Sequence, residues 1–562
     1  MKQLGILDSA FINLEQTNTP QHVGGMGIYD PSTAPGGFVR FKDVIANFER
    51  RLGSHPLFRT RLLQVPGGLD RPYWVKDANF DVEYHLRHIA LPRPGDWRQL
   101  CIQVARLHAR PIDMTHPLWE AYIIEGLDKI PNLPEGSFAV YTKMHHSLVD
   151  GAGGASFMEL LHDLVANPDP VEEEEFPEPR LVDDPPSLGE LMAKTSVNRV
   201  KGTLGIIKGA VTKGVEMGKY ALQIARDEIP APDISAPKTI LNKPVGPHRV
   251  FDAAEFPLDG FKDIKNAMGV TINDVALSII GGALQRYLES RDAVEEGSLA
   301  ASIPLNMRTR RKVTDDNNQV GAVFASLHSD IADPIERLKA VHASTQEAKE
   351  YGEASPMVDV LALAGVFSPL VSKAVAGFWS RNELSKYIPV NVSTVVSNVA
   401  GPNFSLYCAG ARMVDYYGLG VLTPGIGIFH LVFSYSGKLT LSVLADRDII
   451  PDPETYKAFL EESYEELLTA AGVSQRSGKA KAKPKVRAKT KAKPKARPKL
   501  TAKPRAKVKP KLKVQPKTKA KPKAKPKAKA KSKAKTAAKA KPKTRPRART
   551  QAKAKARRSP RS

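Results

Sequence analysis

The amino-acid sequence predicts an α/β protein built from two bodies that each mix strands and helices. The 562 residues exceed the size of one ordinary domain. Apolar residues at helical spacing and at a spacing of two alternate in residues 1–165 and again in residues 246–475. A stretch rich in proline and acidic residues separates these bodies, and a lysine-rich stretch ends the chain. We therefore expect an N-terminal half, a linker, a C-terminal half and a tail.

The N-terminal half, residues 1–165, is predicted to contain helices and one well-marked strand. Apolar side chains recur at helical spacing in Arg40–Leu52, "RFKDVIANFERRL", and "WRQLCIQVARLHARPID" continues in the same style. The later segment "GSFAVYTKMHH" alternates, which predicts a strand with Phe138, Val140, Thr142, Met144 and His146 on one face. A glycine-rich turn and then a helix are expected after this strand, because apolar residues return at helical spacing.

The linker, residues 166–245, differs from both halves. It begins with "ANPDPVEEEEFPEPRLVDDPP", which is typical of a surface loop. The following segment, Ser187–Pro230, is helix-like, with scattered lysines and small residues. Two interpretations stay open for it: a connecting helix that lies on the protein, or a helix on a lipid surface with its basic side chains toward the head groups.

The C-terminal half, residues 246–475, is predicted to be rich in strands. The segment "FDAAEFPLDGFKDIKNAMGVTINDVALSIIGGALQRYL" indicates a strand, a helix, a loop and a second helix. Further strands are expected in "ASIPLNMRT", "NQVGAVFASL", "VNVSTVVSNVAGP", "ARMVDYYGLGVL", "IGIFHLVFSYSG" and "KLTLSVLADRD". A last helix, "DPETYKAFLEESYEELLTAAG", should be capped at Asp452 or nearby.

The tail, residues 476–562, is of low complexity and strongly basic. Residues 471–562 hold 39 of the 84 Lys and Arg and none of the 59 Asp and Glu, which leaves the first 470 residues with 45 basic against 59 acidic side chains. Like charges and prolines prevent a packed core, so we expect disorder. Such a segment suits nucleic acid through counterion release, or anionic lipid at ~1 kcal/mol per basic residue near the surface.

The cellular location is predicted to be cytoplasmic, at the periphery of a membrane or of lipid inclusions. Two cysteines, Cys101 and Cys408, form no CxxC pair and favour a reducing compartment. The N-terminus carries Asp8 and Glu15 and lacks a long apolar run, so no signal peptide is expected. The most apolar stretch, Met357–Trp379, is interrupted by charged residues and a proline, which disfavours a membrane span.

The stretch "YTKMHHSLVDGAGG" is the strongest candidate for a site. His145, His146 and Asp150 come together at a strand end, followed by Gly151 and further glycines. A metal site, plain structure and proton transfer are the three interpretations. The metal interpretation is the weakest, because the HExxH pattern is absent and the segment alternates like a strand. We expect neither a metal nor a cofactor.

Proton transfer fits the residue types best. An imidazole can accept a proton from a hydroxyl during attack, and small residues leave room for a substrate. We expect His146 to be the general base, with Asp150 either orienting it or holding the turn through an ion pair, for example with Arg308. The chain has no GxSxG pattern, so direct attack by a bound acceptor is simpler than a covalent acyl-enzyme.

"HHSLVDG" matches the HHxxxDG motif of the acyl-CoA-dependent acyltransferase superfamily, which includes chloramphenicol acetyltransferase-like enzymes and condensation domains. Four further segments, in the same order along the chain, resemble the bacterial wax ester synthase/acyl-CoA:diacylglycerol acyltransferase family. They are "LDSAFINLEQTNTPQHVGGMGIYD", "HPLWEAYIIEGL", "TINDVALSIIGGALQRYL" and "VVSNVAGP". The resemblance covers residues 4–470. It departs from the family at His116, where Arg is frequent, and at Ala400, where the loop usually has proline; both bear on loop stiffness or acceptor preference.

The resemblance implies two chloramphenicol acetyltransferase-like halves that face each other across a substrate tunnel. It also implies that the second histidine of the motif, His146, is the base, and that acyl-CoA donates the acyl group as a substrate. Asn273 becomes a candidate oxyanion donor or substrate-binding residue, although a helix N-cap explains it equally well. Pro117–Trp119 and Ser397–Pro402 are expected to shape the fold and the tunnel.

We therefore expect an O-acyltransferase that transfers a long-chain acyl group to diacylglycerol, and also to a long-chain alcohol to make wax ester. Its expected partners are these substrates, and an anionic membrane or lipid-droplet surface or nucleic acid for the tail. Two alternatives remain. One is a nucleic-acid-associated structural protein, supported by the tail alone; the other is an acyltransferase-like body that only binds lipid.

Overall fold

The computed structural model describes residues 2–53, 56–148, 158, 160–168, 186–196, 198, 226, 236–306, 320–354, 370, 374 and 392–473. Asp150, Gly151 and Arg308 lie outside these residues, as do most of the linker and the whole tail. The predictions made for those positions stay predictions.

Chain segments of the N-terminal half form two sheets and several helices. The elements are β1 (Lys2–Gln3), α1 (Ile6–Leu14), β2 (His22–Asp30), α2 (Phe41–Gly53), β3 (Thr60–Leu63), β4 (Tyr73–Lys76), α3 (Val82–His85), β5 (Leu86–Ala90), α4 (Trp97–His108), β6 (Trp119–Glu125) and β7 (Phe138–His145). Short 3-10 helices occupy Pro31–Thr33, Pro35–Gly37, Pro56–Arg59 and Pro66–Gly68.

The C-terminal half contributes a longer series of strands and the larger helices. After a 3-10 helix at Ile240–Asn242 come β8 (Arg249–Pro257), α7 (Leu258–Met268), α8 (Ile272–Glu289), β9 (Ala300–Asn306), β10 (Val320–Ser326), α9 (Pro334–Ala354), β11 (Thr394–Ala400), β12 (Tyr407–Cys408), β13 (Ala411–Leu419), β14 (Ile428–Tyr435), β15 (Lys438–Asp446) and α12 (Pro453–Ala470).

Two six-stranded sheets organise the molecule. The first has the order β12-β13-β2-β7-β6-β5, and the second has the order β10-β9-β11-β14-β15-β8. A three-stranded sheet, β1-β4-β3, accompanies the first. Strand β13 comes from the C-terminal half, yet it pairs antiparallel with β2 of the N-terminal half, with a bulge between Met413 and Asp415. The two halves therefore share one sheet.

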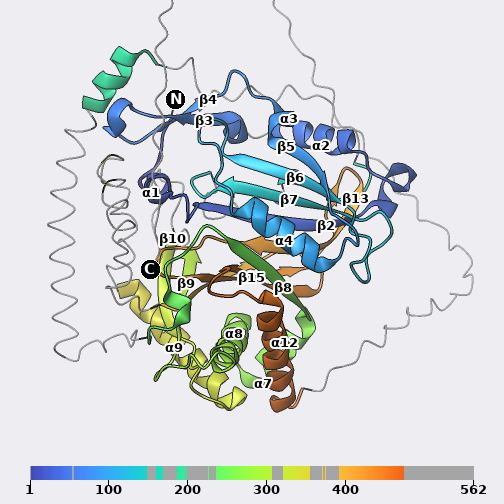
Figure 1. Ribbon diagram of the computed structural model, residues 1–562, viewed down its shortest axis with the longest axis vertical. Coiled ribbons are helices and arrows are strands. Elements are labelled where there is room, and N and C mark those ends of the chain that lie inside the picture. Colours follow the sequence, from blue (N-terminus) through green and yellow to red (C-terminus); the bar gives the residue numbers. More distant parts are fainter. Residues whose placement is uncertain are drawn as a thin grey trace, which may run out of the picture. The chain divides into compact units, whose positions relative to one another are not determined.

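Three apolar cores hold these layers together. Helices α7, α8, α9 and α12 lie together on one side of the second sheet (Figure 1) and form one core with it. A second core joins α2 to the first sheet and includes the fully buried Trp119. The third core lies between the halves, where α4 and Tyr141 meet Phe251 and Phe429. Burial at this third core fixes the first sheet against the second.

Glycines in β2 make room for aromatic rings on the first sheet. A Cβ atom at Gly25 would lie 1.9 Å from the hydroxyl oxygen of Tyr416, and one at Gly27 would lie 2.6 Å from that of Tyr29. Contacts this short do not occur in folded proteins, so a side chain at either position would displace a tyrosine. The glycines thus allow Tyr29 and Tyr416 to lie flat over the strand.

The predicted fold class is confirmed: the protein is a mixed α/β structure whose two halves each carry a large sheet. The segments expected as strands in the C-terminal half appear as β8 to β11 and β13 to β15. Asp452 is the N-cap of α12, but its side chain forms no capping hydrogen bond; its carboxylate instead accepts from the Tyr287 hydroxyl, at 2.9 Å, and from Arg291. A substrate tunnel and the limits of the four parts stay predictions.

Part of the linker is described. Residues 188–196 are helical, and Leu191 is buried against Val65 and Tyr73. The Asn198 amide donates to Asp70 and to the Tyr73 hydroxyl, at 2.9 and 3.1 Å. This piece of the linker therefore packs on the three-stranded sheet, as the connecting-helix interpretation expects.

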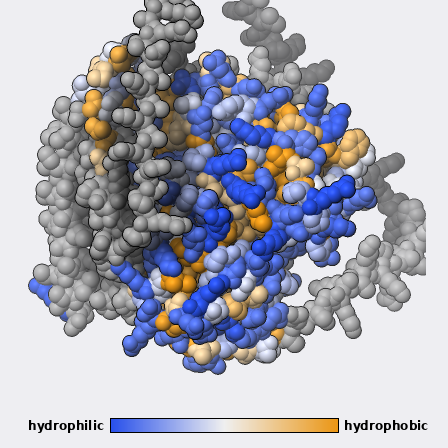
Figure 2. Space-filling model, viewed as in Figure 1, coloured by the Kyte–Doolittle hydropathy of each residue, from blue (hydrophilic) through white to orange (hydrophobic). Residues whose placement is uncertain are grey.

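The described surface and helices bear on membrane contact in two ways. No single described helix has the length and apolarity to cross a bilayer, whereas α7 and α8 together pass that test but are bent by 101° at their junction. Hydrophilic side chains dominate the face in Figure 2, with smaller apolar patches between them.

Candidate active site

Strand β7, which lies between β2 and β6 in the first sheet, ends at the histidine pair. All eight of its residues are buried, and its last residue, His145, pairs in register with His22 of β2. The His145 amide donates to the Leu118 carbonyl at 2.9 Å, and the His146 amide donates to the Gln21 carbonyl at 2.8 Å. Backbone hydrogen bonds to two different segments thus fix the point where the chain leaves the sheet.

His145 is held through Nδ1, whereas its Nε2 is buried without a hydrogen-bond partner among the described residues. Its side chain is 1% exposed. The backbone amide of Ser147 donates to Nδ1 at 3.1 Å, and the Ser147 hydroxyl lies 2.8 Å from the same atom. Because Nδ1 accepts, the ring proton of the neutral form belongs on Nε2, which faces the Glu15 carboxylate at 3.5 Å. These contacts suit a structural role.

His146 differs from its neighbour. Its ring stacks on Phe11 with centroids 3.9 Å apart and planes at 14°. Its Nδ1 is buried without a hydrogen-bond partner among the described residues. A small edge of the residue stays exposed, but the dense packing lowers the pKa to about 4, first through desolvation and then through His145. At neutral pH the ring is therefore uncharged and can accept a proton.

The segment from Phe11 to His22, called the strap below, surrounds the pair. Glu15 accepts a hydrogen bond from the Gln21 amide and faces His145. The Gln21 carbonyl in turn accepts from the His146 amide. Gln21 and His22 are themselves buried, with 3% and 1% exposure. One continuous segment therefore contacts both histidines.

A buried lysine lies on the same strand. Lys143 is fully buried, and its Nζ donates to the carbonyls of Leu107 and Arg110, at 3.2 and 2.9 Å, and lies 3.2 Å from a Glu120 carboxylate oxygen. Burial lowers the pKa of Lys143 despite Glu120. Burial also lowers the pKa of His22, and the nearby His108 and Lys143 lower it further. The pair thus adjoins a region in which added positive charge is disfavoured.

Asn273 lies in the first turn of α8, in the C-terminal half. The N-cap of α8 is Thr271, which forms a capping box with Asp274, so the N-cap interpretation of Asn273 is wrong. Asn273 is half-buried, and its side-chain oxygen accepts from the Asn398 amide at 3.4 Å. Sequence spacing placed the cap two residues too late, because Asn and Thr both favour this position.

Asp274 fixes the local geometry around Asn273. Its side chain is fully buried and accepts from Thr345 and from His342, both at 2.7 Å. Burial alone would raise the pKa of this carboxyl, but the hydrogen bonds from Thr345, His342 and Thr271 hold the pKa below its usual value. Asp274 therefore ties α8 to α9 as an ionised group.

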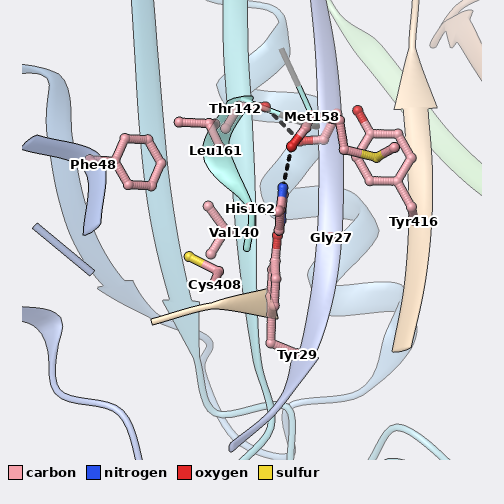
Figure 3. A pocket seen from close by; sticks show the side chains of 11 residues that line it. Gly27, Tyr29, Phe48, Val140, Thr142, Met158, Leu161, His162, Cys408 and Tyr416 are labelled. Atoms are coloured by element: carbon pink, nitrogen blue, oxygen red, sulfur yellow. Dashed lines mark hydrogen bonds between the residues drawn. The ribbon is translucent and has the colours of Figure 1, made fainter. Parts of the chain in front are cut away.

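An apolar pocket lies at the first sheet, lined by residues of both halves (Figure 3). The Tyr29 hydroxyl and His162 Nε2 are 2.6 Å apart, and the Thr142 hydroxyl donates to the Gly25 carbonyl at 3.2 Å, so these polar groups are paired. Thr142 lies four residues before His146, or about 13 Å along an extended strand. The lining is formed by Gly25, Gly27, Tyr29, Phe48, Val140, Thr142, Met158, Leu161, His162, Cys408 and Tyr416.

The structure brings some of the expected site residues together and leaves others undescribed. His145 and His146 are adjacent and differently held, whereas Asn273 contacts Asn398 instead. Phe11, Glu15 and Gln21 were missed as neighbours of the pair, although they lie in a segment that carried the family resemblance. Among the described residues, no three His, Cys, Asp or Glu side chains gather as a metal site.

The two-sheet architecture is that of two solved acyltransferases. The structure matches the solved wax ester synthase/diacylglycerol acyltransferase from Marinobacter aquaeolei VT8 with a TM-score of 0.57 and 27% identity, covering 84% of this chain and 100% of that one. It also shares the fold of the trichothecene 15-O-acetyltransferase TRI3 from Fusarium sporotrichioides, with a TM-score of 0.51, 14% identity, and coverage of 84% and 94%.

Sequence comparison narrows this class. The wax ester synthase/diacylglycerol acyltransferase catalytic domain matches residues 4–276, and the C-terminal domain of the same family matches residues 317–468. The probable diacylglycerol O-acyltransferase tgs2 of Mycobacterium tuberculosis is 32% identical over 474 residues, which cover 83% of this chain and 98% of the relative. A second, putative diacylglycerol O-acyltransferase of that species is 33% identical, covering 83% and 99%. The chain belongs to the wax ester synthase/diacylglycerol acyltransferase family.

Proposed function

We propose that the protein transfers a long-chain acyl group from acyl-CoA to the hydroxyl of diacylglycerol, forming triacylglycerol, and that a long-chain alcohol also serves as acceptor. Family membership supports an acyl-CoA donor and a hydroxyl acceptor. The names of the mycobacterial relatives favour diacylglycerol, and that of the Marinobacter protein favours both acceptors. The observation that carries the proposal is the His146 ring, which is stacked on Phe11, partly exposed, and kept uncharged at neutral pH by its low pKa.

In the proposed reaction, the acceptor oxygen attacks the thioester carbonyl while the His146 ring takes the hydroxyl proton. The C–O bond forms, and the carbonyl oxygen becomes an oxyanion that needs donors, for which Asn273 is the candidate. Collapse of the intermediate breaks the C–S bond, and the imidazolium returns its proton to the departing CoA thiolate. The products are the ester and free CoA, with no net change in protons.

The surroundings of His146 fit this role. A low pKa keeps the lone pair available at neutral pH, and Phe11 fixes the plane of the ring. His145 fits a supporting part, because Ser147 and Glu15 already engage it. Asp150 is assigned either to orienting His146 or to holding the turn, and Gly151 to leaving space beside it.

The basic tail is proposed to hold the enzyme on an anionic membrane or lipid-droplet surface in the cytoplasm. Its charge gives each basic residue near such a surface ~1 kcal/mol. Full-length protein should sediment with phosphatidylglycerol vesicles at low salt, and a chain ending at residue 475 should not. Release of the full-length protein from the vesicles by duplex DNA would show that nucleic acid competes for the tail. Stronger binding to DNA than to vesicles would contradict the lipid assignment.

The decisive experiment is an acyl-transfer assay with palmitoyl-CoA, offering dipalmitoylglycerol and hexadecanol in parallel to the wild type and to His146→Ala. Ester formation should fall by about 10²- to 10⁴-fold in the variant, which is the usual contribution of a general base. Circular dichroism and the thermal midpoint would establish that the variant is folded. Near-normal turnover in folded His146→Ala would remove His146 as the base.

A further inference from the structure

The strap gathers the contacts of the histidine pair into one segment. Phe11 stacks on the His146 ring, Glu15 faces His145, and Gln21 accepts from the His146 amide. Three of these contacts are made within eleven residues of chain, whose own internal bonds are local: the Thr19 amide donates to the Gln16 carbonyl, and the Gln21 side-chain amide donates to the Thr19 carbonyl. Displacement of the strap would therefore move the residues that contact the ring and the backbone amide of His146.

One side chain from the C-terminal half reaches the middle of the strap. Arg249, the first residue of β8, has a side chain only 3% exposed. Its Nη2 donates to the Asn18 carbonyl, between Glu15 and Gln21. Its Nη1 stays on its own side, donating to the Gly246 carbonyl at 2.7 Å and the His248 carbonyl at 3.2 Å. The planar guanidinium thus bridges the two halves with different nitrogens.

The Arg249 bridge is itself fixed on the side of the C-terminal half. Asp446 lies 3.7 Å from Nη1, and its carboxylate accepts from the amides of Gly246 and Asp448, at 2.7 and 2.8 Å. A buried guanidinium with a nearby carboxylate and three carbonyl acceptors has little freedom to move. The position of Asn18 therefore follows the position of β8.

We infer that Arg249 is a positioning residue of the acyl-transfer site, through which the C-terminal half sets the strap and hence the orientation of His146. The inference rests on the proposed role of His146 as base. Arg249 acts through Asn18, Gln21 and the His146 amide, not through the histidine rings. A displacement of about 1 Å in a catalytic group can cost about 10²-fold in rate.

The test compares Arg249→Lys and Arg249→Met with the wild type in the palmitoyl-CoA assay. Lysine keeps the charge but has a single nitrogen in place of the forked guanidinium. It therefore cannot donate at once to Asn18 in the strap and to the carbonyls beside β8. We expect kcat to fall by about 10- to 100-fold in both variants, with KM for palmitoyl-CoA changed by less than about two-fold. The acid limb of kcat/KM, which reports the free base, should also move up from about 4 toward 6.5, because a displaced strap admits water to the ring.

Trp97→Phe is the matched control. The Trp97 indole of α4 donates to Asp252 at 2.7 Å, so this bond also joins the N-terminal half to β8, but it does not touch the strap. The control should lower the thermal midpoint by a similar amount while keeping kcat and the acid limb. Equal loss of kcat in Trp97→Phe would assign the Arg249 effect to general loosening between the halves and overturn the inference.

Two further outcomes separate this inference from the proposed function. Wild-type kcat and pH profile in a folded Arg249→Lys, beside an inactive His146→Ala, would reject the positioning role alone. Activity retained in folded His146→Ala would reject the base itself. Should Arg249→Met fail to fold, Arg249→Lys still decides the question, because it retains the buried charge opposite Asp446.

Discussion

The two halves each bury a histidine beside a sheet, and the two residues are held in opposite ways. His430 of β14 is fully buried; its Nδ1 lies 2.8 Å from the Thr394 hydroxyl and its Nε2 lies 2.7 Å from the Tyr456 hydroxyl. Both ring nitrogens of His430 therefore have a hydroxyl partner, and the Thr394 hydroxyl also lies 3.1 Å from the Ile428 carbonyl. His146 instead leaves a buried nitrogen unpartnered among the described residues.

Burial lowers the pKa of both rings, to about 3 for His430 and about 4 for His146. A lowered pKa therefore does not distinguish a base from a structural histidine. Hydrogen bonding and exposure separate these two rings, because His430 is fully buried with a partner on each nitrogen, whereas His146 is partly exposed. The comparison assigns structure to the C-terminal histidine and chemistry to the N-terminal one, and each assignment can be tested separately.

The largest expected effect is a difference in catalytic activity between variants of His146 and variants of His430. His146→Gln should lower kcat by about 10²- to 10⁴-fold, while His430→Gln should stay within about three-fold of wild type per folded molecule. Glutamine can form hydrogen bonds but cannot serve as a proton acceptor at neutral pH. Ester formation by each variant, normalised to the folded fraction by circular dichroism, checks this. A comparable loss in both variants would mean that the unpartnered nitrogen is not what matters.

The second effect concerns stability. His430→Leu leaves the buried hydroxyls of Thr394 and Tyr456 without their ring partner, and each such loss costs about 1–3 kcal/mol. We expect the free energy of unfolding in urea to fall by about 2–4 kcal/mol. Adding Tyr456→Phe to His430→Leu should recover part of that loss, because it removes one orphaned hydroxyl. Additive losses in the double variant would contradict the hydrogen-bond account.

Acid should destabilise the protein between pH 6.5 and about 4. Burial lowers the pKa of several described histidines, so in this window the unfolded chain binds protons that the folded protein does not, and stability falls as pH falls. Each of these histidines lowers the free energy of unfolding by about 1.4 kcal/mol per pH unit as the pH falls. Asp415, whose pKa is raised to about 6 by burial, acts in the opposite direction and offsets the contribution of one histidine. The histidines are His22, His85, His108, His146, His162 and His430.

The matched measurement is the thermal midpoint from pH 7 to pH 4. His430→Leu should show a shallower decline than the wild type, because one proton-binding difference is gone. A midpoint that is flat across the window, or an equally steep decline in the variant, would contradict the buried neutral state of these rings.

The smallest effect sharpens the description of His146. Phe11→Leu keeps apolar cover but removes the parallel ring contact, which is worth about 0.5–1.5 kcal/mol. We expect kcat to fall by about 2- to 10-fold, with little change in KM for acyl-CoA. Phe48→Leu, which alters an aromatic residue of the same half away from the pair, is the control and should leave kcat unchanged.

Local patterns predicted much of the fold. Alternation identified β7, helical spacing identified α2 and α12 within one or two residues of their observed ends, and α4 ends five residues before the predicted segment does. The histidine pair could be singled out because its members are adjacent and follow a strand. Each of these features depends on residues that are close in sequence.

Long-range contacts could not be predicted in the same way. The bond from Arg249 to Asn18 spans 231 residues, and no spacing in either segment indicates it. Alternation identified β13 as a strand, but it cannot say which sheet accepts that strand, because pairing depends on partners far away in the chain. The N-cap interpretation of Asn273 failed for a different reason, since Thr at position 271 suits a cap as Asn does.

The pairing of β13 with β2 has a consequence for synthesis on the ribosome. Until residues 411–419 have emerged, β2 is the open edge of a sheet whose other N-terminal strands, β5, β6 and β7, end at residue 145. An unpaired margin of this kind attracts strands from other nascent chains. The sheet of the N-terminal half is thus completed only after most of the polypeptide has been translated. A fragment that stops before residue 411 would leave the ribosome with β2 as an unpaired edge strand.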